Sequence, residues 1–95
     1  MTKPELDIDA ARRLVDAISA DLAALPPDST RHAQLRAEVD QLKAMLADAE
    51  VHPPAVEAGM RSVHGQVERA STELQADGVR AGMFLQDIGR MLGLD

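Results

Sequence analysis

Three histidines and sixteen acidic residues supply most of the side chains in this sequence that could bind a metal or act in catalysis. His64 and Glu68 lie four residues apart, which would place both on one face of a helix as two metal ligands. A catalytic zinc site needs three protein ligands, and no HExxH or ExxH pattern supplies a third. We therefore predict no metal site: we expect His64 to lie on a solvated helix flank and His52 in the turn before Pro53.

Other catalytic patterns are missing from the sequence. A glycosidase needs two acids opposed across a cleft, whereas the acids here fall on the polar faces of predicted helices. No serine lies in a GxSxG turn, and no glycine-rich stretch matches a phosphate-binding motif. The absence of cysteine excludes a thiol nucleophile and a disulfide framework. The sequence predicts no catalytic residue and no cofactor, hence a protein that is not an enzyme. The catalytic alternative is a site assembled between subunits from Arg61, His64 and Glu68.

Charge and composition narrow the classes of partner. The net charge is −6, and Phe84 is the only aromatic residue, so the chain has neither the basic surface nor the stacking platforms of a nucleic-acid-binding protein. No apolar run approaches the ~20 residues of a membrane span. Residues 1–5 lack the apolar core of a signal peptide. We expect an acidic cytoplasmic protein that forms a single domain over residues 1–95.

The elements that must position any site are predicted to be helices. Strong helix formers dominate, and no stretch alternates apolar with polar residues over the length of a strand. The proline pairs Pro26-Pro27 and Pro53-Pro54, together with Asp77-Gly78, interrupt the pattern. The sequence therefore predicts an all-α fold with helices over residues 8–25, 29–50, 54–76 and 78–92. Asp7 or Asp9 is expected to cap the first helix and Asp28 or Ser29 the second.

Each predicted helix carries an apolar stripe whose spacing alternates between three and four residues, as in a heptad repeat. The stripe of the first helix is Ile8, Ala11, Val15, Ile18, Leu22 and Leu25. That of the second is Leu35, Val39, Leu42, Leu46 and Ala49. That of the third is Val56, Met60, Val63, Val67, Ala70 and Leu74. Since short turns join these segments, we expect an antiparallel bundle of three long helices and a shorter C-terminal helix.

The junction at Asp77-Gly78 has two interpretations. The stripe continues through Ala81, Phe84 and Ile88, so one helix from Pro54 to Leu92 is an alternative. A break is preferred, because Asp77 can cap a new helix and a glycine inside a helix costs about 1 kcal/mol.

The C-terminal helix is apolar on more than one side, and Gly82, Gly89 and Gly93 could let another backbone approach closely. It could be buried within the bundle with Gly93 as its C-cap, form a dimer or partner surface, or lie on a membrane. The candidate interaction surface consists of Met83, Phe84, Ile88, Met91 and Leu92. Many stripe positions hold Ala or Val, which bury little area, so we expect a homodimer to complete the core.

The layout resembles a family of short bacterial all-helical proteins of unknown function. Asp28-Ser29-Thr30-Arg31 opens the second predicted helix, 40–46 continues it, and 88–94 provides the Leu-Gly ending typical of that family. The family has His-Pro before its last helix, whereas this chain has Asp77-Gly78 there and His52-Pro53 one junction earlier. The resemblance implies a helical fold and no activity. We expect a non-enzymatic, self-associating scaffold or regulatory interaction module, with binding of a membrane surface or a small apolar ligand as the alternative.

Overall fold

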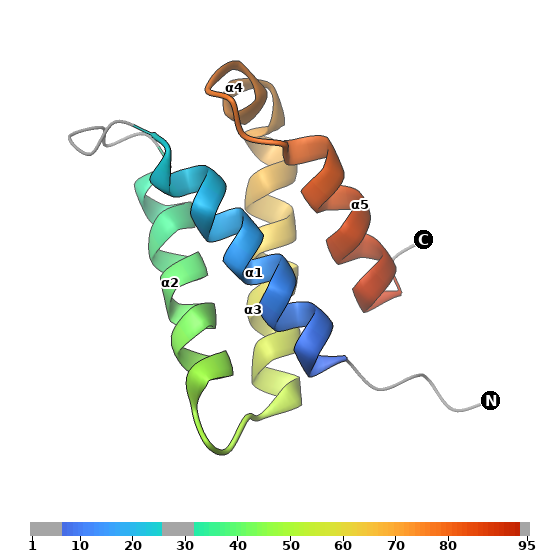
Figure 1. Ribbon diagram of the computed structural model, residues 1–95. Helices are drawn as coiled ribbons and strands as arrows, with labels where there is room; N and C mark the ends of the chain where they lie inside the picture. Colours follow the sequence, from blue (N-terminus) through green and yellow to red (C-terminus); the bar gives the residue numbers. More distant parts are fainter. Residues whose placement is uncertain (1–6, 26–31, 94–95) are drawn as a thin grey trace.

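The computed structural model describes residues 7–25 and 32–93, and these residues form five helices (Figure 1). The helices are α1 (Ile8–Ala23), α2 (Ala33–Ala47), α3 (Pro53–Arg69), α4 (Ser71–Ala76) and α5 (Ala81–Leu92). The predicted all-α class is confirmed. Four of the helices pack in a ring, in which α1 contacts α2, α2 contacts α3, α3 contacts α5, and α5 returns to α1. The short α4 sits at the end of α3 and turns the chain back into α5 (Figure 1).

The core is built from the predicted apolar stripes. Nearly every stripe residue of α1, α2 and α3 is buried, and the stripe continues through Leu74, Ala81, Phe84 and Ile88. The core cluster of the described residues is made entirely of apolar side chains. The predicted position Ala49 is exposed, because α2 ends at Ala47 and Asp48 has an extended backbone. The heptad spacing therefore identified the buried face, and the helix ends decided where burial stops.

The first two helices are shorter than predicted. Asp7 caps α1, since its side chain accepts a hydrogen bond of 3.1 Å from the backbone N–H of Ala10. The predicted caps Asp28 and Ser29 lie outside the described residues, and α2 begins only at Ala33. Its N-cap is His32, which has a left-handed backbone with φ of 60° and makes no capping hydrogen bond.

The region predicted as one helix over 54–76 is two helices. Ala70 has φ −103° and ψ 13°, outside helical geometry, and separates α3 from α4. The break at Asp77-Gly78 is confirmed and the continuous helix to Leu92 is wrong, because Gly78 turns the chain with φ of 90°. The last helix starts at Ala81 rather than 78. Asp77 does not cap it; it ends α4 instead.

The contact between α2 and α3 is close, and Gly59 makes it so. A Cβ atom at this position would lie 2.7 Å from a terminal methyl group of Leu42 and 3.6 Å from Cε of Met45. The glycine thus lets two long side chains of α2 approach the backbone of α3. Gly82, predicted to allow such an approach, has open space beside it. Gly93 caps the C-terminus of the last helix, as predicted, with a left-handed backbone and φ of 70°.

Among the described residues, no helix combines the length and apolar character that crossing a membrane requires.

Candidate functional site

The five residues predicted as an interaction surface fall into two groups. Phe84 and Ile88 are completely buried and Leu92 is 3% exposed, because α5 turns this face towards α3 and α1. These three side chains belong to the core, which corrects the predicted surface. Met83 is 40% exposed, more than any other large apolar residue that the structure describes, and Met91 is partly buried. What remains of the surface is therefore the edge of α5 that carries these two methionines.

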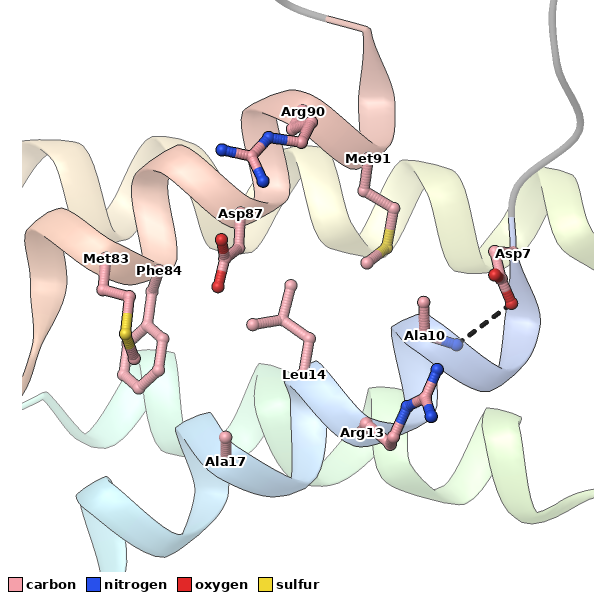
Figure 2. A pocket seen from close by; sticks show the side chains of 10 residues that line it. All are labelled: Asp7, Ala10, Arg13, Leu14, Ala17, Met83, Phe84, Asp87, Arg90 and Met91. Atoms are coloured by element: carbon pink, nitrogen blue, oxygen red, sulfur yellow. Dashed lines mark hydrogen bonds between the residues drawn. The ribbon is translucent and has the colours of Figure 1, made fainter.

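Met83 and Met91 line an open groove of about 580 Å³ between α1 and α5 (Figure 2). We call this cavity the α1–α5 groove. Its lining residues come from two antiparallel segments: Asp7, Ala10, Arg13, Leu14 and Ala17 of the α1 segment, and Met83, Phe84, Asp87, Arg90 and Met91 of α5. Leu14 projects into the space between the helices, and Phe84 contributes a ring edge to one end (Figure 2). The lining is mostly apolar, with charged side chains along both edges.

The groove exists because α1 presents small side chains where α5 presents long, flexible ones. Ala10 and Ala17 lie on the α1 side of the groove, with Leu14 the only large apolar side chain between them. The two helices share fewer contacts than any other adjacent long-helix pair of the ring. Small residues leave space between two helices unless the backbone or a side chain of the neighbour fills it, and protein interiors are otherwise close-packed. Here the space remains open.

Three of the four charged side chains on the groove edges are unpaired within the described residues. Arg13, Asp87 and Arg90 make no hydrogen bond or ion pair there, whereas Asp7 is engaged as the cap of α1. Arg13 and Asp7 lie on the α1 edge, and Asp87 and Arg90 on the α5 edge (Figure 2). Both edges therefore offer one charge of each sign to a binding partner.

One end of the α1–α5 pair is fixed by an ion pair between Asp21 and Arg80. The guanidinium donates bonds of 3.0 and 3.1 Å to the two carboxylate oxygens, and the backbone N–H of Arg80 donates a third of 3.2 Å. The side-chain hydrogen bonds of Arg80 lower the pKa of Asp21, with partial burial opposing them and the backbone bond and charge of Arg80 adding to them. The Arg80 guanidinium also lies 5.7 Å from the centre of the Phe84 ring. This ion pair positions the first turn of α5 against the last turns of α1.

A second polar contact, which the sequence did not predict, joins His32 to Asp77. Nε2 of the histidine lies 3.0 Å from a carboxylate oxygen, and the imidazole side chain is only 4% exposed. The contact connects the start of α2 to the turn that follows α4. The residues are 45 positions apart, so no local spacing signals the pair. It is structural in position, since it lies away from the α1–α5 groove.

The residues weighed for catalysis are not brought together. Arg61 donates a bond of 3.2 Å to Glu57 on its own helix, while Glu68 is exposed and His64 partly buried on α3. His52 is exposed at the start of that helix. No cluster of three or more His, Cys, Asp or Glu residues among those described is placed to hold a metal ion.

No family model matches the chain, and comparisons with curated proteins and with solved structures find no significant similarity.

Proposed function

We propose that this chain is a non-enzymatic protein-interaction module, and that the α1–α5 groove receives the apolar face of a partner helix. The groove itself carries the proposal. It runs between two helices, its lining is mostly apolar, and charged side chains border it, which are the features of helix-in-groove recognition. Met83 and Met91 suit this role, because unbranched methionine side chains adapt to the shape of a bound helix.

The unpaired edge charges support binding of a protein rather than of an uncharged ligand. Asp87 and Arg90 have no partner within the described part of the chain, so a bound helix with suitable polar flanks could pair with them. Charged groups of this kind fix register and orientation more than they add affinity. A scaffold or regulatory module needs that selectivity.

Site-specific photocrosslinking tests the proposal. A photoreactive amino acid replaces Met83 in the groove or, as the matched control, the exposed Gln41 on α2, and cells producing each variant are irradiated. We expect discrete protein adducts from position 83 and none from position 41. The adducts should disappear when Ala17→Trp fills the groove. Equal adducts from both positions, or none from either, would contradict the proposal.

The alternative, binding of a membrane surface by α5, predicts a different result. Exposed Met83 favours it, since an apolar side chain on a helix surface can insert into a lipid interface. The chain would then sediment with liposomes, and irradiation of the position-83 variant would label lipid. An interaction module stays in the supernatant.

A further inference from the structure

We propose that the partner at the α1–α5 groove is a second copy of this chain, docked face to face about a twofold axis that runs along the groove, so that α5 of each copy lies over α1 of the other. This inference rests on the proposed function and names the partner of the same site. It is carried by the order of the charges on the two edges. A twofold dimer presents the same patch from both copies, so the patch must complement itself.

The α1–α5 groove meets this requirement. Read in one direction along the groove, the α5 edge carries Asp87 and then Arg90, whereas the α1 edge carries Arg13 and then Asp7 (Figure 2). A half-turn about an axis along the groove keeps this direction and lays the α1 edge of one copy on the α5 edge of the other. Arg13 then faces Asp87 of the second copy, and Asp7 faces its Arg90. Every contact occurs twice and joins opposite signs.

The same charges do not pair across the groove within one chain. Arg13 and Asp87 lie on opposite edges, and neither makes an ion pair within the described residues. A second copy would supply the missing partners of both. The two methionines would meet small side chains at the same time, because the half-turn places Met83 and Met91 of one copy over the α1 side, where Ala17 and Ala10 leave space.

The apolar area available for this contact is modest. Phe84 is fully buried and Leu14 is 8% exposed in the single chain, so dimerisation would cover mainly the methionines and the charged edges. Stable dimers bury about 800 Å² on each partner, and smaller interfaces belong to transient complexes. We therefore expect a weak, concentration-dependent dimer whose formation depends on the edge charges.

Exchange of the edge charges tests the arrangement. The variants are Arg13→Asp and Asp87→Arg, measured separately and as an equimolar mixture. In either variant alone, like charges meet twice across the twofold axis. The dissociation constant of the dimer should therefore rise roughly tenfold or more. In the mixture, every facing pair again has opposite signs, and association should return. The double variant Arg13→Asp/Asp87→Arg should associate by itself.

Static light scattering over a series of chain concentrations up to roughly 1 mM, each determined by refractive index, gives the mass without dilution on a column, so a millimolar affinity is visible. Arg69→Asp makes the same charge change on α3, outside the groove, and should associate like the wild type. Circular dichroism of each variant confirms that the helices persist.

The outcomes separate the two proposals. Recovery of dimer in the mixture supports the twofold arrangement. Single variants that associate like the wild type, a mixture that stays monomeric, or a wild type that is monomeric throughout would overturn it. If the photoreactive group at position 83 then crosslinks to a different protein, the interaction module stands and the second copy as its partner fails. If it crosslinks to nothing, both proposals fail.

Discussion

The two helix pairs α2–α3 and α1–α5 use similar residues and reach opposite results. In the α2–α3 pair, Leu42 and Met45 occupy the space that Gly59 leaves open, and the helices pack closely. In the α1–α5 pair, Ala10 and Ala17 also leave space, the side chains of α5 fill only part of it, and a groove of about 580 Å³ remains. In these two pairs, a small residue therefore leads to close packing where long side chains lie directly opposite and leaves a groove where they do not.

The contrast also separates stability from binding. The closely packed α2–α3 pair contributes buried apolar contacts that stabilise the bundle. The α1–α5 pair, which leaves the groove open, exposes apolar and charged side chains that can contact another molecule. Substitutions at the two pairs should therefore affect different properties.

Removal of the Phe84 ring should have the largest effect. The ring is completely buried and supports both the core and the floor of the groove. We expect Phe84→Ala to lower the free energy of unfolding by roughly 3–5 kcal/mol, because it removes a large side chain and leaves a cavity. Urea unfolding followed by circular dichroism measures the loss. Phe84→Leu should retain much of the stability, and equal losses from both variants would show that the site needs an aromatic ring rather than volume.

A side chain added at Gly59 should disrupt the close contact between α2 and α3. Gly59→Leu would force Leu42 and Met45 away from α3. This overpacking should lower the free energy of unfolding by about 1–3 kcal/mol. Gly65 on the same helix is the control, since a Cβ there would meet only the end of the Arg69 side chain at 3.7 Å. Gly65→Leu should be neutral or stabilising by up to about 1 kcal/mol, because it removes a glycine from a helix. Equal thermal midpoints for the two variants would contradict a close contact at Gly59.

A larger side chain in the groove should make the α1–α5 pair as closely packed as the α2–α3 pair. Ala17→Leu places apolar atoms in the space beside Met83, and we expect it to raise the free energy of unfolding by roughly 0.5–1.5 kcal/mol. The same change should weaken association or crosslinking at position 83. A stabilised chain that still binds its partner would show that binding occurs elsewhere.

The Asp21–Arg80 ion pair should give the smallest effect, visible as pH dependence. The pKa of Asp21 is lowered in the folded chain, so the folded state binds fewer protons than the unfolded state near that pKa. Its stabilising contribution is present above the ordinary carboxyl pKa of about 3.9 and is lost as the pH falls through the lower folded value. Asp21→Asn should be slightly less stable than the wild type at pH 7, and this difference should vanish towards pH 2. A constant difference across that range would contradict the assignment.

The apolar stripes were predictable from sequence because one helix period determines them. Val56, Met60 and Val63 could be assigned to the core without knowledge of their neighbours. The break at Gly78 was also visible, since glycine tolerates the positive φ found there.

The site was less predictable, because it depends on which helices face each other. Heptad spacing marks Phe84 and Ile88 as apolar, yet it does not distinguish a core face from a binding surface, and the structure buries both. The role of Gly59 requires Leu42 opposite it, and the His32–Asp77 contact joins residues 45 positions apart. Only the arrangement in three dimensions reveals these pairs.

The ring of helices is closed by the two that are farthest apart along the chain. Contacts between successive helices need only short loops, whereas the α1–α5 contact requires the whole intervening chain to fold back, at a greater cost in loop-closure entropy. Because this contact is also the least extensive of the ring, we expect α1 and α5 to associate last during folding. In the native state they would separate most readily, so their backbone amides would exchange hydrogen faster than those of α2 and α3. A partner bound across the groove would hold α1 and α5 together and slow that exchange.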